Sequence, residues 1–395
     1  MKRFFSYIIL SFFLLLLPTG QASANNNVSI RLSLLTCAPG EEIYSLFGHT
    51  AIRYENPSQG IDVVFNYGLF SFNTPNFIFR FSLGETDYQL GATDYERFAA
   101  EYAFFGRSVW QQTLNLTDEE KTELIRLLQE NYRPENRVYR YNFFYDNCAT
   151  RPRDKIEESI AGKVIYPAEP QDGSLTFRDI VHQYCKGHPW ARFGIDLCIG
   201  SEADQPITQR QMMFAPFYLM DAFDGAQIKG DSIQRPLITA NELVVDATPE
   251  PDESDWMPTP LQCSLLLFIL TAAATIYGIR RRTGLWGIDL FLFGIAGIVG
   301  CVLAFLALFS QHPAVSSNFL LLVFHPGQLL FLPYIIYCVR KGKKCWYLTL
   351  NLAVLTLFIV LFPVIPQRFD FAVVPLALCL LIRSASNLIV TSKKK

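Results

Sequence analysis

The stretch LQCSLLLFILTAAATIYGIRRR, residues 261–282, decides the architecture of this chain. Up to residue 279 it is almost wholly apolar and long enough to cross the hydrocarbon core of a bilayer as a helix. Arg280, Arg281 and Arg282 follow directly, and short loops rich in Lys and Arg stay on the cytoplasmic side of a membrane. The stretch therefore predicts a transmembrane helix that starts outside the cytoplasm and ends inside it.

Four further apolar stretches follow the first one. They occupy residues 285–309, 319–339, 346–363 and 369–390. Lys and Arg residues cluster after the third and the fifth stretch, whereas the alternate loops contain only Arg368. The pattern predicts an all-α bundle of about five transmembrane helices over residues 261–395, with the preceding domain outside the cytoplasm.

The N-terminus leads independently to the same topology. Lys2 and Arg3 precede an apolar run, which ends before the small residues Ala22, Ser23 and Ala24. This order is typical of an export signal, so residues 1–24 are predicted to be a signal peptide or, alternatively, an uncleaved signal anchor. Residues 25–247 then form an exported domain, and the acidic, proline-rich residues 248–260 link it to the bundle.

Composition limits the classes of function. Half of the residues are hydrophobic, and the net charge is −2. No basic stripe is present of the kind that nucleic-acid-binding proteins use, so no nucleic-acid partner is expected. The sequence indicates no cofactor and no metal ion.

The exported domain has the pattern of an α+β fold. Strands are predicted over residues 28–35, 47–54, 63–67 and 77–83 from apolar alternation and flanking turn residues. Thr117 and Glu120 form a capping box that opens a helix, which ends before Pro134. A second helical stretch covers residues 154–161.

Polar side chains interrupt the apolar stretches at five positions. They are His325, Gln328, Asn351, Arg383 and Asn387. Polar groups within a membrane are costly and often mark function. His325 precedes Pro326 and Gly327, so a kink or a helix–helix hydrogen bond is the alternative there. Arg383 is predicted to extend its charged end to the inner surface of the membrane.

Two segments of the exported domain contain candidate catalytic residues. His49 lies near the start of a predicted strand, and Cys148 lies near a helix start, where backbone amides and a nearby imidazole lower a thiol pKa. A third polar group usually orients such an imidazole, and Asn66 on the neighbouring strand is the first candidate. The other candidates for this third role are Asp62, Glu41 and Glu42.

Disulfide formation is the alternative explanation of these cysteines. The exported domain contains Cys37, Cys148, Cys185 and Cys198, and disulfides persist outside the cytoplasm. Cys148 paired with Cys37 would be structural, and His49 would then be a hydrogen-bonded core residue. Cys185 and Cys198 are close enough in sequence to pair with each other.

Four motifs together resemble the Lnb family of Bacteroidetes, which are membrane-bound lipoprotein N-acyltransferases. They are TCAPGEEIY at residues 36–44, FGHTAIR at 47–53, FNYG at 65–68 and YDNCATR at 145–151. The resemblance implies a periplasmic domain similar to permuted NlpC/P60-type papain-like thiol enzymes, in which the His strand precedes the Cys helix. It implies Cys148 as nucleophile and His49 as base, in the inner (cytoplasmic) membrane of a bacterium.

The reaction implied by the resemblance has two lipid substrates in one bilayer. An acyl chain of a phospholipid would pass through a thioester on Cys148 to the α-amine of a diacylated lipoprotein. A cell-wall peptide hydrolase with the same residues and a non-enzymatic envelope scaffold are the alternatives. The Phe-rich residues 65–81 are expected either to line an acyl groove or to pack inside the sheet domain.

Overall fold

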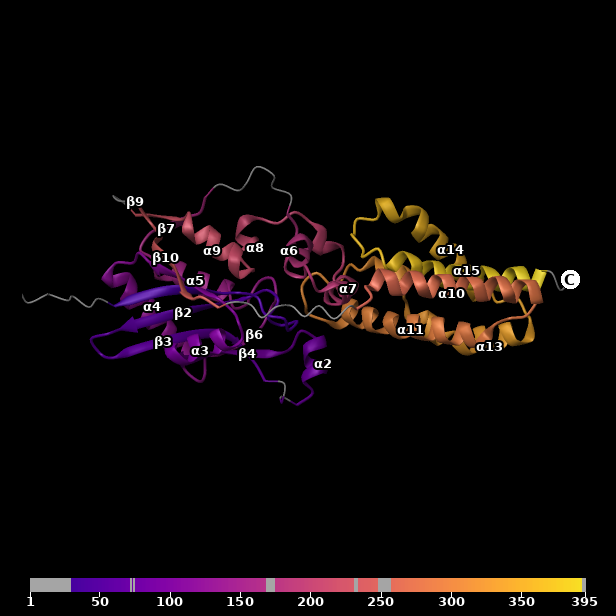
Figure 1. Cartoon of the computed structure of the whole chain (residues 1–395), viewed down its shortest axis with the longest axis horizontal. Helices are drawn as coiled ribbons and strands as arrows, with labels where there is room; N and C mark the ends of the chain where they lie inside the picture. The colour runs from indigo at the N-terminus through magenta and orange to yellow at the C-terminus, as the bar shows by residue number, and fades with distance from the viewer. Residues whose placement is uncertain are drawn as a thin grey trace, which may run out of the picture.

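The computed structural model describes residues 30–71, 73, 75–167, 175–230, 234–247 and 257–392. A sheet domain and a helical bundle follow one another along the long axis of the molecule (Figure 1). The predicted division into an α+β domain and a membrane-spanning helical domain is confirmed. The predicted export signal and most of the predicted linker over residues 248–260 lie outside the described residues.

The first domain is built on a seven-stranded antiparallel sheet with the strand order β10-β5-β1-β2-β3-β4-β6. Its strands are β1 Arg31–Cys37, β2 His49–Asn56, β3 Ile61–Leu69, β4 Asp87–Asp94, β5 Val109–Leu114, β6 Val138–Arg140 and β10 Ile238–Val245. A smaller sheet contains β7 Lys163–Ile165, β8 Gln227–Lys229 and β9 Gln234–Pro236. The strands predicted over residues 28–35, 47–54 and 63–67 correspond to β1, β2 and β3.

Helices cover both faces of the large sheet because successive side chains of a strand point to opposite faces. Leu34 belongs to the core cluster that includes residues of α4, α5 and α9, whereas Leu35 belongs to the cluster on the α3 side. The helices of this domain are α2 Phe77–Ser82, α3 Tyr95–Phe104, α4 Asp118–Tyr132, α5 Thr150–Ser159, α6 Phe177–Tyr184, α7 Pro189–Cys198, α8 Gln209–Met212 and α9 Pro216–Asp224, with the 3-10 turn η1 Ser201–Asp204. The capping box of Thr117 and Glu120 opens α4 as predicted.

The strand predicted over residues 77–83 is wrong, because this segment forms the short helix α2. Its aromatic side chains favour a strand by intrinsic preference. However, α2 connects β3 to β4, and these two strands already pair with each other. The connection therefore has no free sheet edge to join, and Phe77 and Phe81 stack on one another one helical turn apart.

The second domain contains up to five candidate membrane spans among the described residues. Its helices are α10 Pro260–Arg281, α11 Trp286–Phe309, α12 Pro326–Leu330, α13 Leu332–Lys341, α14 Trp346–Leu361 and α15 Val373–Ser392, with the 3-10 turns η2 Phe319–Leu322 and η3 Phe362–Val364. The third predicted span is not one helix, because it bends by 74° between residues 330 and 332. Pro326 and Pro333 supply no backbone N–H, which favours such a break.

The expectation that Arg383 reaches the inner membrane surface is wrong. Its guanidinium lies inside the bundle, where it donates to the Asp289 carboxylate at 2.7 and 3.1 Å and to the Thr275 hydroxyl at 3.0 Å. Both charged side chains are 2 % exposed. A buried pair satisfies the arginine without contact with water, so it has no need to extend along the helix.

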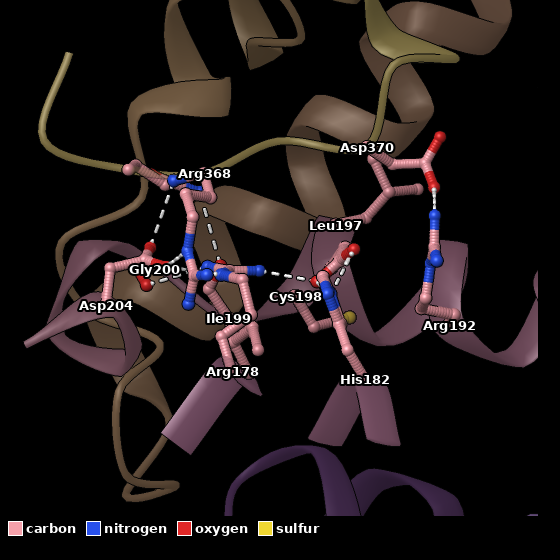
Figure 2. A network of polar contacts seen from close by, with 12 residues as sticks. Arg178, His182, Arg192, Leu197, Cys198, Ile199, Gly200, Asp204, Arg368 and Asp370 are labelled. Atoms are coloured by element: carbon pink, nitrogen blue, oxygen red, sulfur yellow. Dashed lines mark hydrogen bonds and ion pairs between the residues drawn. The ribbon is translucent and has the colours of Figure 1, made fainter. Parts of the chain in front are cut away.

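A polar network joins the two domains (Figure 2). Arg178 of α6 is fully buried and donates to Asp196 at 2.6 Å and to Asp204 at 2.8 Å. Arg368, in the connection between α14 and α15, donates to the same Asp204 carboxylate at 2.9 Å. Arg192 of α7 pairs with Asp370 at 3.2 Å. The periplasmic end of the bundle is therefore attached to the sheet domain at a defined position.

Candidate active site

The start of α5 is fixed by the side chain of Asn147. Its Oδ1 accepts hydrogen bonds from the backbone amides of Ala149 at 2.8 Å and Thr150 at 2.9 Å. Its Nδ2 donates to two backbone carbonyls at 2.8 and 2.9 Å. These bonds cap amides that a helix start otherwise leaves unsatisfied. Cys148, between Asn147 and the helix, therefore has a fixed backbone position.

The helix itself starts earlier than the predicted 154–161, because α5 already begins at Thr150. Cys148 precedes its first residue by two positions. Pro152 lies in the first turn, where an amide has no partner within the helix and its loss costs little. The cysteine thus lies at a helix start, as the sequence indicated.

The thiol of Cys148 lies against the ends of β2 and β3. The backbone amide of Thr50 donates a hydrogen bond to its sulfur. In β3, a Cβ at Gly68 would lie 3.6 Å from the Cys148 Cβ, and the φ of Gly68 is +92°. Glycine adopts this backbone conformation without strain, which allows β3 to turn away beside the thiol. The structure thus brings Cys148 to the residue that follows His49.

His49 begins β2 and contacts Asn66 of β3. The strands pair with Ala51 opposite Asn66, so the two side chains lie on the same face of the sheet. His49 Nε2 lies 3.2 Å from Asn66 Oδ1. When Nε2 carries the proton it donates to this oxygen, and Nδ1 is left as the basic nitrogen.

The other candidates for the third role have different positions. Asp62 accepts two hydrogen bonds from Arg53, at 2.8 and 2.7 Å. Glu41 and Glu42 are exposed in the connection between β1 and β2. Of the four candidates, Asn66 is the one whose side chain meets the imidazole.

Burial controls the charge state of the two central groups. It raises the pKa of the Cys148 thiol to about 11, although the Thr50 amide acts in the opposite direction. It lowers the pKa of His49 to about 4, against the hydrogen bond with Asn66 and together with the positive charge of Arg107. At neutral pH the thiol and the imidazole are both uncharged. The expected lowered thiol pKa is therefore wrong, because desolvation outweighs the effect of the helix start.

This charge state predicts how Cys148 reacts with iodoacetamide. Only the thiolate is alkylated, so the rate is expected to rise about tenfold per pH unit between about pH 6 and about pH 9. Mass spectrometry of the peptide that contains Cys148 measures the rate. In the urea-unfolded chain, the alkylation rate of the same peptide should stop rising near the ordinary thiol pKa of about 8.5. If the alkylation rate of the folded chain no longer rose with pH below about pH 8.5, Cys148 would already be a thiolate at neutral pH and the prediction would be contradicted.

The alternative disulfides are wrong, because all nine cysteines of the chain are free. Cys37, opposite His49 in β1, is buried and accepts a hydrogen bond from Tyr102. Burial raises its pKa to about 12. Among the described residues, no group of three or more His, Cys, Asp and Glu side chains is arranged to hold a metal ion.

An ion pair beside the thiol was not singled out from the sequence. Arg151 donates to both carboxylate oxygens of Asp146, at 2.6 and 2.7 Å. Its guanidinium carbon also lies 3.5 Å from the centre of the Tyr139 ring. Asp146 and Arg151 flank Cys148, and these contacts hold both of them next to β6. In the sequence, this ion pair is indicated only by the position of Asp146 and Arg151 on either side of the cysteine.

A pocket of about 290 Å³ lies between α2 and the strands β3, β4 and β6. Its polar rim includes Arg80 and Asp87, which form an ion pair at 2.7 Å. Its apolar lining consists of Leu69, Phe70, Phe77, Tyr88 and Val138. Burial raises the pKa of Tyr88 to about 12, and the nearby Cys148 acts in the same direction. Tyr88 thus connects the pocket to the core cluster against which Cys148 packs.

The Phe-rich residues 65–81 divide between the core of the sheet domain and the pocket. Phe65 and Tyr67 are buried in the core under α4 and α5. Phe70 and Phe77, beyond the turn at Gly68, line the pocket instead. The change of role coincides with the end of the regular pairing of β3.

Comparison with known families gives two matches. The model described as the Lnb N-terminal periplasmic domain matches residues 21–182, and the model described as the Lnb transmembrane domain matches residues 252–395. No protein of curated function and no solved structure matches the chain. The two family matches make it a membrane protein with a periplasmic domain, which agrees with the topology deduced from its loop charges. The chain belongs to the Lnb family.

Proposed function

We propose that this protein is a lipoprotein N-acyltransferase of the bacterial inner membrane. It moves an acyl chain from a phospholipid, through a thioester on Cys148, to the α-amine of a diacylated lipoprotein. The observation that carries the proposal is that the Cys148 sulfur accepts a hydrogen bond from the amide of Thr50, the residue after His49, while His49 itself contacts Asn66. Membership of the Lnb family and attachment of the domain to a membrane bundle support it.

In the first half-reaction, the Cys148 sulfur forms a bond to the ester carbonyl carbon of the phospholipid. His49 accepts the thiol proton as the bond forms. The ester C–O bond then breaks, and the leaving alkoxide takes the proton from His49 to become a lysophospholipid. Since both groups are neutral at rest, the proton moves together with the attack, and the amide of Thr50 stabilises the developing charge on sulfur.

In the second half-reaction, the lipoprotein amine attacks the thioester carbonyl. A C–N bond forms, the C–S bond breaks, and one amine proton returns to the sulfur through His49. The products are an N-acylated lipoprotein and the free thiol. Both substrates lie in the same leaflet, so a domain fixed to the bundle meets them at a high effective concentration. A covalent intermediate of this kind gives ping-pong kinetics.

Isotope transfer in a bilayer tests the proposal. The full chain in nanodiscs receives phospholipid with heavy acyl chains, and mass spectrometry follows the label. A heavy acyl group on Cys148 that neutral hydroxylamine releases is expected first. After addition of a diacylated lipopeptide, the label should appear on its α-amine.

Other outcomes separate the alternative functions. Label that leaves only as free fatty acid contradicts the transferase. Cleavage of cell-wall peptides without labelling of Cys148 indicates the hydrolase. A chain that neither takes up label nor cleaves such peptides is a scaffold.

Asn66→Ala tests the orienting role of the amide. Without the 3.2 Å contact to Nε2, the ring of His49 loses its fixed tautomer and position. We expect the turnover number to fall about 10²-fold with little change in the KM for phospholipid. The matched control is Asn56→Ala, at the other end of β2, where the side chain bonds to Tyr54. Equal losses in both variants would assign Asn66 a structural role only.

A further inference from the structure

Large apolar side chains are strongly exposed at one end of the periplasmic domain. The six most exposed in its described part are Ile43 at 65 %, Tyr44 at 64 %, Ile78 at 80 %, Phe79 at 59 %, Phe104 at 81 % and Phe105 at 63 %. We name this set the apolar rim. Several large apolar side chains exposed at one end of a domain indicate a contact with a membrane or another protein.

The three parts of the apolar rim lie at the same end of the sheet. Residues 43–44 belong to the connection from β1 to β2, residues 78–79 to that from β3 to β4, and residues 104–105 to that from α3 to β5. Cys37, the last residue of β1, pairs with the first residues of both β2 and β5. The amide of Ala38 also bonds to the Ser108 carbonyl at 2.8 Å. This is the end of the sheet at which Cys148 lies.

Direct contacts place α2 at the periplasmic end of α11. The Gln311 amide donates to the Leu83 carbonyl at 2.8 Å, and the ring Nε2 of His312 lies 2.6 Å from the Phe81 carbonyl. The rings of Phe79 and Phe305 lie 6.0 Å apart. Figure 1 shows α2 on the side of the sheet domain that faces the bundle. The α2 part of the apolar rim is thus level with the end of a membrane span, and the other two parts lie at the same end of the sheet.

We propose that the apolar rim lies in the outer leaflet of the membrane, and that the pocket behind α2 takes one fatty acyl chain of a membrane glycerolipid. Continuity with α11 favours lipid over a protein partner, because Leu308 and Phe309 are exposed on the last turn of that span. Helix α2 separates the pocket from the outer leaflet. Phe77 lines the pocket, whereas Phe79 faces α11. The assignment of the chain in the pocket as the acyl donor rests on the proposed function.

The polar residues of the pocket are suited to the same ligand. Arg80 and Arg140 both pair with Asp87 at the mouth, next to the apolar lining. A glycerolipid has the matching order, a polar head followed by an apolar chain. With its head at this mouth, the chain lies along Phe70 and Tyr88, and the ester is near Cys148.

Photo-crosslinking tests the membrane contact without any chemistry at the thiol. p-Benzoylphenylalanine is introduced at position 79 or 104 of the full chain carrying Cys148→Ser, in nanodiscs with labelled acyl chains. We expect the yield of crosslinks to lipid to be about tenfold above that from position 165. The free energy of moving one large apolar side chain out of water favours contact with lipid by about this factor. Ile165 is the matched control, since it is 40 % exposed on β7 at the far end of the domain. Equal crosslinking at the three positions overturns the proposal.

Chain-length dependence tests the pocket. Val138→Trp narrows the pocket from the β6 side, and Leu243→Trp is the matched control on an exposed apolar side chain of β10, outside the lining. The ratio of turnover with long-chain phospholipid to turnover with a soluble butyryl ester should fall about tenfold in Val138→Trp only. An unchanged ratio overturns the assignment of the pocket. No turnover of either ester by the unmodified chain contradicts the proposed function instead, and leaves the crosslinking result to decide the membrane contact.

Discussion

Replacing Cys148 with serine is expected to lower the rate of acyl transfer about 10³-fold or more, since no other group of the site can form the thioester. A serine hydroxyl needs a stronger base than a thiol does. His49 is a weak base here, because burial lowers its pKa to about 4. The imidazole therefore has little capacity to activate the hydroxyl.

A single-turnover experiment with labelled phospholipid in nanodiscs measures this loss. The matched control is Cys198→Ser, which changes another free and partly exposed cysteine, at the end of α7. The control should keep the rate of the unmodified chain. If Cys148→Ser retained about a tenth of the activity or more, covalent catalysis through this sulfur would be refuted.

Arg178→Met is expected to cause the largest loss of stability, about 3–5 kcal/mol, because it removes the buried cation that two buried carboxylates share. Arg178 is 0 % exposed and donates to Asp196, Asp204 and two backbone carbonyls. Methionine has a similar length but no hydrogen-bond donor. Asp204 would keep only Arg368, and Asp196 would keep only His182.

Thermal unfolding of the full chain in detergent measures this effect. Arg126→Met is the matched control, since Arg126 pairs with Glu123 and Glu130 on the exposed surface of α4. Exposed pairs of this kind contribute little, so the control midpoint should not move. Equal midpoints for the two variants would show that the buried network does not stabilise the fold.

The membrane topology and the central pair of strands could be predicted because both follow from local, periodic patterns. Apolar length identifies a span, and Arg and Lys in the loops orient it. Asn66 was the first choice among four because its strand was expected to pair with that of His49, and the register of β2 and β3 puts the two side chains on one face. These features depend on residues close in sequence or on one strand pairing.

The features that escaped prediction depend on tertiary contacts. α2 is helical because its neighbours β3 and β4 already pair, which no property of residues 77–83 reveals. The thiol pKa follows from burial, which a helix-start motif does not report. Arg383 seemed able to reach water because its partner, Asp289, lies 94 positions earlier in the chain.

That separation has a consequence for how the bundle is made. The ribosome delivers Asp289 well before Arg383, so the acidic side chain of α11 enters the bilayer while its counter-ion is still unsynthesised. Asp289 lies in the first turn of α11, so its carboxylate without a counter-ion costs less than the about 2.5–3.5 kcal/mol that insertion scales give at the centre of a span. The last helix, α15, thus completes the charge balance of the second one, and assembly of the bundle finishes only when its C-terminal segment arrives.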